Sequence, residues 1–145
     1  MTIIKKAAPE DLDGIVKIEN ETSAAPWSRE ALSRDIARED ALVLAARDDD
    51  VTGYADAWIV AGEMQLNNIG VTADSRRRGI ASHLMTELIA EAGKAGCTLI
   101  TLEVRAGNEA ALALYGKYGF KKTGLRPGYY EDNGEDAILM DLEIN

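Results

Sequence analysis

The sequence predicts a single α/β domain built on a mixed, mostly antiparallel sheet of seven strands flanked by four helices. Residues 41–71 hold three consecutive β-like runs separated by turn residues, which indicate an antiparallel meander. Two strongly helical segments begin near residues 79 and 108, and each follows a β-like run, as is typical of α/β sheets. With 145 residues, 46% of them hydrophobic, the chain has the size and apolar content of one domain, residues 1–145.

The first half of the chain predicts one strand, two helices and the meander. The opening TIIKK is β-prone, and Pro9 then begins a helix whose apolar residues between positions 12 and 18 repeat at helical spacing. A second, mostly polar helix follows in REALSRDIARED, with Ser28 as its N-cap. The strands ALVLAAR, VTGYADAWIVAG and EMQLNNIGV come next, separated by a DDD turn and a Gly-Glu turn.

The second half predicts two helices, one strand between them and a closing hairpin. From Gly79 onward, apolar residues recur four apart on two neighbouring rows, and Gly93 and Gly96 are expected to end that helix. TLITLEV is the predicted strand, and NEAALALYGKYG is a helix with Asn108 as its N-cap. A hairpin of FKKTGLR and EDAILMDLEI around an Asn-Gly turn completes the sheet.

Composition limits the partners and the location of the protein. The net charge is -9, with 25 acidic and 16 basic residues, which argues against nucleic-acid binding because phosphate contacts need clustered Lys and Arg. The acidity suits a cationic partner such as an amine or a basic peptide, or it serves solubility alone. Neither a signal-peptide pattern nor a long apolar span is present in the sequence, so we expect a soluble, cytoplasmic protein. No apolar stripe is left over, so a monomer is expected.

The chain has one cysteine and one histidine, and both are expected to be structural. A single cysteine rules out an internal disulfide, and together with a single histidine it argues against a thiolate or imidazole metal cluster. Cys97 stands just before a predicted buried strand, where a free thiol behaves as a small apolar group. His83 lies in the helix that begins near Gly79, with no catalytic partner nearby in the sequence.

Three consecutive arginines in RRRGIA precede the strongest predicted helix of this acidic chain. The N–H groups of a helix's first turn lack intrahelical partners, so an anion can bind there. Gly79 permits close approach to the backbone, and Ala81 adds little bulk. The segment predicts a phosphate site, with a solvated basic turn as the alternative. The motifs GxGxxG and GxxxxGK(S/T) are absent from the sequence, which argues against a dinucleotide fold and a P-loop.

Glu103 is the candidate catalytic base because a carboxylate inside an otherwise apolar strand is paired or functional when it is buried. Burial would raise its pKa towards the range of a general base, and a structural ion pair with Arg105 is the alternative. Tyr115 in the next helix can reach the same crevice, or it belongs to the core. Gly70, in the strand before the RRRGIA loop, indicates a bulge or a close backbone approach, with a packing reason as the alternative.

Together these motifs resemble the GNAT superfamily of N-acetyltransferases over nearly the whole chain. RRRGIA matches the Q/R-x-x-G-x-G/A pyrophosphate loop of that superfamily. More narrowly, APWS, NIGV, LEVRAGNEAALALYGKYGF and GYYEDNGEDAILM are similar to the bacterial enzymes that acetylate the N-terminal alanine of small-subunit ribosomal protein eighteen. Ala25, Gly107 and Gly128 depart from that pattern and bear on substrate preference.

The resemblance implies a GNAT fold with strands four and five splayed around acetyl-CoA, and no metal. It implies direct attack of an amine on acetyl-CoA, with Glu103 as general base and Tyr115 as general acid. The residues implied to bind acetyl-CoA are Ile69, Gly70, Val71, Arg76, Arg77, Arg78, Gly79, Ile80, Ala81, Ser82 and Asn108. The residues implied to bind the peptide substrate are Trp27, Tyr129 and Tyr130.

The implied partner is the N-terminal α-amine of a protein, with alanine as the acetylated residue and a small-subunit ribosomal protein as the expected substrate. No nucleic-acid or membrane partner is expected. The first alternative is a GNAT enzyme that acetylates a small amine or a lysine side chain. The second is a non-catalytic acyl-CoA-binding domain, and the presence of both Glu103 and Tyr115 argues against it.

Overall fold

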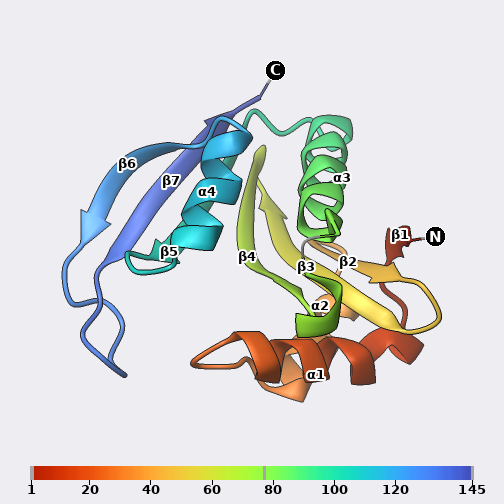
Figure 1. The fold of residues 1–145 in the computed structure, drawn as a ribbon. Coiled ribbons are helices and arrows are strands. Elements are labelled where there is room, and N and C mark those ends of the chain that lie inside the picture. The colour runs from red at the N-terminus through yellow and green to blue at the C-terminus, as the bar shows by residue number, and fades with distance from the viewer. Residues whose placement is uncertain (1, 77, 145) are drawn as a thin grey trace.

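A computed structural model describes residues 2–76 and 78–144 and shows a mixed sheet with helices on both faces (Figure 1). In the described residues, the strands lie in the order β1-β2-β3-β4-β5-β7-β6, with β4 and β5 parallel and the other neighbours antiparallel. The strands are β1 (Ile3–Lys6), β2 (Ala41–Arg47), β3 (Val51–Val60), β4 (Glu63–Val71), β5 (Leu99–Arg105), β6 (Lys121–Arg126) and β7 (Ala137–Glu143). The helices are α1 (Leu12–Thr22), α2 (Arg29–Ala37), α3 (Ile80–Lys94) and α4 (Glu109–Lys117). The predicted fold class is confirmed.

The sheet separates two hydrophobic clusters. On one face, α1 and α2 pack over β2 and β3, and on the other face α3 packs over β3 and β4 (Figure 1). Residues of α4 join the cluster of α3, so the helices of the two βα units share one face. None of the described helices is both long and apolar enough to cross a membrane.

The predicted apolar row of α3 is confirmed. Ile80, Leu84, Leu88 and Ala92 are each at most 2% exposed, because residues four apart lie on the same side of a helix. The predicted end of α3 is wrong at its first glycine, since the helix runs through position 93 to Lys94. Gly96, whose φ is +79°, terminates it instead, because glycine adopts left-handed backbone angles without steric cost.

The C-terminal strands depart from a tight hairpin. β7 lies between β5 and β6, and residues 127–136 form a long loop instead of a two-residue turn. The predicted Asn-Gly turn lies inside this loop, where Gly134 has a φ of +73° and donates its N–H to the Tyr130 carbonyl at 2.8 Å. β7 pairs with both β5 and β6, which brings the loop to the end of β5.

β4 opens the middle of the sheet. It pairs with β5 only from Glu63 to Leu66, so the rest of each strand is free of the other. In the β3–β4 ladder, Asp56 faces Asn68 and the next residue of β3 faces Leu66, which makes Asn67 the extra residue of a β-bulge. A bulge at this position bends β4 away from β5.

Gly70 is not the bulge that the sequence suggested. It pairs with Tyr54 in regular register. A Cβ at this position would lie 3.0 Å from both Ile18 Cγ2 and Thr22 Oγ1. The alternative expectation, a packing reason, is therefore confirmed, because side chains of α1 lie against this position.

Candidate functional site

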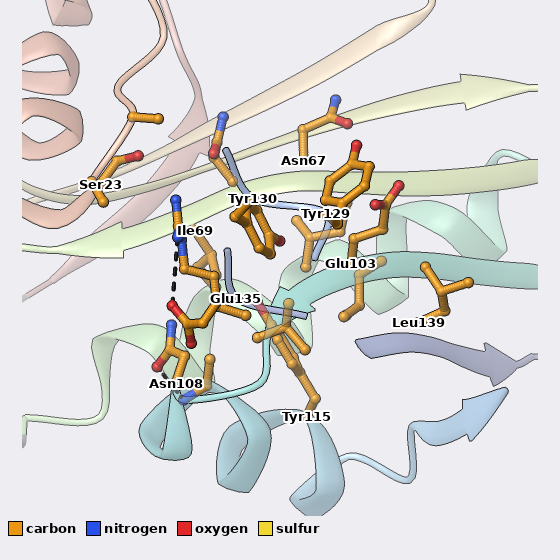
Figure 2. Close-up of a pocket in the computed structure, with 18 of the residues that line it drawn as sticks. Ser23, Asn67, Ile69, Glu103, Asn108, Tyr115, Tyr129, Tyr130, Glu135 and Leu139 are labelled. Atoms are coloured by element: carbon orange, nitrogen blue, oxygen red, sulfur yellow. Dashed lines mark hydrogen bonds and ion pairs between the residues drawn. The ribbon is translucent and has the colours of Figure 1, made fainter. Parts of the chain in front are cut away.

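A cavity of about 880 Å³ opens where β4 and β5 separate. The loop between α1 and α2, the strands β4 and β5, α4 and the loop between β6 and β7 all contribute to its wall (Figure 2). The predicted site residues that line it are Trp27, Ile69, Glu103, Asn108, Tyr115, Tyr129 and Tyr130. Tertiary folding thus brings together the predicted catalytic pair and the predicted peptide-binding residues.

Glu103 reaches the cavity as an exposed side chain, so the expected burial of this carboxylate is wrong. The physical reason is that the β4–β5 ladder ends at the pair Leu66 and Leu102. Glu103 is the next residue of β5, so β4 no longer lies beside it. Its position on β5 still directs the carboxylate into the opening (Figure 2). Glu103 is therefore a candidate base because its carboxylate lines the cavity, and not because it is buried.

Tyr115 comes to the same cavity from α4. It is 6% exposed, and its ring lies 5.6 Å from the ring of Phe120, measured between centroids. Burial raises the pKa of Tyr115 to about 12, and the nearby Tyr130 acts in the same direction. Figure 2 shows Glu103 and Tyr115 on opposite sides of β5. The cavity therefore offers a carboxylate on one side of the strand and a protonated phenol on the other.

A buried carboxylate holds the loop that carries Trp27. Glu19 on α1 is 2% exposed, and its Oε2 accepts the backbone N–H of Trp27 at 2.9 Å. Its other oxygen accepts the hydroxyl of Tyr54. Burial and the charge of Glu19 raise the pKa of Tyr54, which keeps that hydroxyl protonated as a donor. The Trp27 ring packs against Trp58, with centroids 5.9 Å apart.

Two arginines lie against the tyrosines of the opposite wall, Arg105 on Tyr130 and Arg126 on Tyr129, the latter 5.4 Å from the ring centroid. Tyr129 and Tyr130 meet edge to face, with centroids 5.1 Å apart. The Arg105 guanidinium lies 4.0 Å from the Tyr130 centroid and bonds both carboxylate oxygens of Asp132, at 2.9 and 3.0 Å. This ion pair lowers the pKa of Asp132. Arg105 therefore pairs with the β6–β7 loop, and among the described residues it forms ion pairs with Asp132 and Glu135 and none with Glu103.

The described residues of the RRRGIA segment lie at the start of α3, outside the lining of the cavity. Gly79 is the N-cap with a φ of +77°, it supplies no capping side chain, and the first turn carries no acidic residue. Arg78 points towards the β2–β3 turn, where its guanidinium pairs with Asp48 at 3.1 Å. Arg76 is exposed, and Arg77 lies outside the described residues.

The remaining predicted coenzyme residues offer mainly backbone atoms. Ile80 is buried in the core and Ala81 packs against it, so their side chains face away from a ligand at the helix start. The Ser82 carbonyl accepts the Tyr118 hydroxyl at 2.7 Å, which joins the start of α3 to the end of α4. Gly70 and Val71 are buried in β4 and do not belong to the cavity lining.

Asn108 has the capping role predicted for it and also lines the cavity. Its Oδ1 accepts the N–H of Ala111 at 3.1 Å, which satisfies one donor of the first turn of α4. Cys97 is 2% exposed, and burial raises the pKa of its thiol, in agreement with a structural role. His83 is exposed on α3.

Several lining residues were not predicted from the sequence. Glu19 lies four positions after Ile15, on the side of its helix that carries the apolar residues. Asn67 and Asn68 are consecutive amides within a strand. These two patterns are the signal that could have drawn attention to them. For Arg105, the sequence predicts only a possible ion pair with Glu103. The residues added by the structure are Glu19, Asn67, Asn68, Arg105 and Glu135.

Comparison with known proteins defines first the class of protein and then its family. The solved ribosomal-protein-S18-alanine N-acetyltransferase of Escherichia coli matches with a TM-score of 0.92 at 35% identity, covering 100% of this chain and 95% of that chain. Arabidopsis thaliana NAA60 in complex with acetyl-CoA has a TM-score of 0.91 at 22% identity, covers 100% and 99%, and thus shares the fold. The protein is accordingly an N-acetyltransferase by class.

Sequence similarity gives the family. The ribosomal protein bS18-alanine N-acetyltransferase of Escherichia coli (strain K12) is 34% identical over 147 residues, covering 100% of this chain and 99% of the relative. The profile of the acetyltransferase (GNAT) family matches residues 12–120. The chain belongs to the acetyltransferase (GNAT) family.

Proposed function

We propose that this protein transfers the acetyl group of acetyl-CoA to the N-terminal α-amine of a protein. The acetylated residue is alanine and the substrate is a small-subunit ribosomal protein, modified in the cytoplasm. One observation carries the proposal: the cavity at the end of the β4–β5 ladder joins Glu103, Tyr115 and the aromatic residues of both flanking loops. The similarity to bS18-alanine N-acetyltransferases along the full chain supports the choice of acceptor.

The start of α3 and the free edge of β4 fit acetyl-CoA. Gly79 leaves the first-turn N–H groups of α3 without a side-chain cap, and no acidic side chain stands in that turn to repel a pyrophosphate. Beyond Leu66, alternate backbone groups of β4 point towards β5 without a β5 partner. Such groups can hydrogen-bond an extended pantetheine arm as a strand would. Ile69 and Asn108, both in the cavity wall, lie along this path.

When bound, acetyl-CoA supplies a thioester whose carbonyl carbon forms a bond to the amine nitrogen while its bond to sulfur breaks. Glu103 lies on the exposed side of β5 and accepts the proton that the acceptor nitrogen loses. Tyr115 donates its proton to the departing thiolate from the α4 side, and its pKa of about 12 keeps it protonated at physiological pH. Glu103 and Tyr115 are the catalytic residues of the proposal.

An N-terminal acceptor matches an exposed carboxylate base. An α-amine with a pKa near 8 is about one-tenth neutral at pH 7, whereas a lysine with a pKa near 10.4 is neutral in well under about one molecule in a thousand. At pH 7, deprotonation thus costs roughly 1.4 kcal/mol for the α-amine and nearly 5 kcal/mol for the lysine, whose pKa lies about 2.4 units higher. A carboxylate without special activation is adequate for the first of these substrates.

The test is release of CoA from acetyl-CoA in the presence of a peptide that begins with alanine. A matched peptide has a blocked N-terminus and an added lysine, and mass spectrometry locates the acetyl group. Turnover on the free α-amine alone is the expected result. Turnover on lysine alone would replace the proposed acceptor, and binding of acetyl-CoA without turnover on either peptide would replace the catalytic function by a binding one.

A further inference from the structure

Asp56, in the middle of β3, is a carboxyl without a hydrogen-bond partner in the part of the chain that the structure describes. The residue is 0% exposed, and neither of its oxygens is bonded. Its partner in register on β4 is Asn68, next to the bulged residue Asn67. The amide nitrogens of Asn67 and Asn68 are also buried and unpartnered within the described residues. Buried polar groups are almost always bonded, and these oxygens and N–H groups are complementary.

A second carboxyl lies beside Asp56. Asp35 on α2 is 3% exposed, and its Oδ2 accepts the indole N–H of Trp58 at 2.9 Å. Burial, followed by the neighbouring Asp35, raises the pKa of Asp56 to about 8, while Asn67 and Arg38 act in the opposite direction. At neutral pH the Asp56 carboxyl is therefore protonated.

The other titratable groups around Asp56 do not supply the missing donor. From α1, Glu19 already accepts two hydrogen bonds, one of them from the Tyr54 hydroxyl of β3. Burial, and after it the charge of Glu19, raises the pKa of Tyr54, so this hydroxyl remains a donor to Glu19. Arg38, just after α2, bonds Asp40 at 2.8 and 2.9 Å and lies 3.5 Å from Asp35. The donors left for Asp56 are the two asparagine amides.

The carboxyl pair of Asp35 and Asp56 supports two parts of the cavity lining, the bulged part of β4 and the α1–α2 loop. Asn67 and Asn68 belong to the lining, on the part of β4 that has left β5. Asp35 bonds Trp58, whose ring packs on Trp27, and Trp27 lines the cavity from the α1–α2 loop. A change at Asp56 therefore reaches the bulge and the α1–α2 loop, which lie on the sheet face opposite α3.

We propose that Asp56 is a positioning residue for the acceptor amine: it shares one proton with Asp35 and accepts the amide N–H groups of Asn67 and Asn68, which fixes the bulge at the acceptor end of the cavity. This inference rests on the proposed function, in which the peptide substrate lies at Trp27, Tyr129 and Tyr130; the acceptor end of the cavity is the part lined by these residues, Asn67 and Asn68. Protonated Asp56 donates its O–H to Asp35 and keeps its second oxygen for the amides. An asparagine at this position would keep one oxygen as an acceptor and would donate through its NH₂ in place of the O–H. A valine has a similar size but neither a hydrogen-bond donor nor an acceptor in its side chain.

Steady-state kinetics at pH 7 on the full-length protein separate these variants. Asp56→Val is expected to raise KM for the alanine peptide about fivefold or more, because the buried amides of Asn67 and Asn68 lose their acceptor. Its kcat and its KM for acetyl-CoA are expected to stay within about twofold of the wild-type values. Asp56→Asn and the exposed control Asp50→Asn are expected to stay within about twofold throughout. An unchanged peptide KM in Asp56→Val, or an equal rise in Asp56→Asn, would overturn the inference.

A second readout needs no acceptor. Both tryptophans of the chain, Trp27 and Trp58, belong to this cluster, so their fluorescence reports its state. A pH titration of the wild type should show a step near pH 8, and Asp56→Asn should show none. Absence of the step in the wild type, or its persistence in Asp56→Asn, would overturn the inference even if Asp56→Val does not fold. A wild type that acetylates neither peptide would overturn the proposed function alone, and the titration would still decide on the carboxyl pair.

Discussion

Replacing Asp56 by asparagine tests how strongly the fold resists ionisation of this carboxyl. Asp56 is 0% exposed, and burial beside Asp35 raises its pKa from 3.8 to about 8. Between these pH values the folded chain keeps a proton on Asp56 that the unfolded chain has released. The contribution to stability is complete below the unfolded pKa, and it is lost as the pH rises through the folded pKa.

The size of the effect follows from proton linkage. One bound proton of difference changes the free energy of unfolding by about 1.4 kcal/mol per pH unit. From pH 5 to pH 7, the wild type should therefore lose up to about 3 kcal/mol through Asp56, a loss that Asp56→Asn cannot show. Carboxylates with lowered pKa values, such as Asp132, titrate in both proteins, and their effect cancels in the comparison.

Urea unfolding followed by circular dichroism at pH 5, 6 and 7 measures this difference. Asp56→Asn should gain stability relative to the wild type as the pH rises, by roughly 2–3 kcal/mol over the range. Asp50→Asn, an exposed change of the same kind in the β2–β3 turn, should follow the wild type. Parallel curves for the wild type and Asp56→Asn would refute the reasoning, because they would show that the fold does not hold a proton on Asp56.

Three further changes test the cavity and its supports. Glu103→Gln and Tyr115→Phe should each lower kcat by about 10²-fold or more in the CoA-release assay, and an unchanged kcat in both would remove their assigned roles. Gly70→Ala should lower the free energy of unfolding by about 1–3 kcal/mol, since its Cβ would lie 3.0 Å from two side-chain atoms of α1; an unchanged melting temperature would contradict this. Arg105→Ala should release the β6–β7 loop, because Arg105 bonds Asp132 and lies over Tyr130. A glutamate-specific protease should then cleave faster after Glu131, and KM for the peptide should rise. Cleavage at the wild-type rate would show that Arg105 does not hold the loop.

Local features of the fold were predictable from the sequence because they depend on residues close together in the chain. The buried row of α3 follows from apolar residues four apart, and Asn108 caps α4 as its side chain and position predict. The meander from β2 to β4 follows from alternation and turn residues. The family motifs also placed Glu103 and Tyr115 in one cavity, and the structure brings them there.

Other features were predicted incorrectly because they depend on packing between distant segments. The β-bulge lies at Asn67, while Gly70 is small because α1 approaches it. Glu103 is exposed because the β4–β5 ladder ends before it reaches that residue. Arg78 pairs with Asp48 across a distance of thirty positions that no local pattern encodes.

The sequence by itself determined the order of the helices and strands, the N-caps Ser28 and Asn108, and the family motifs, since periodicity and capping act within a few residues. Tertiary structure alone decided where the sheet opens, which strand lies between β5 and β6, and which charges meet behind the cavity. The carboxyls of Asp35 and Asp56 come together from α2 and β3, and the pKa of Asp56 is raised only because folding removes this carboxyl from water and places it beside Asp35. Desolvation and proximity of this kind are properties of the packed chain, and no local stretch of sequence contains them.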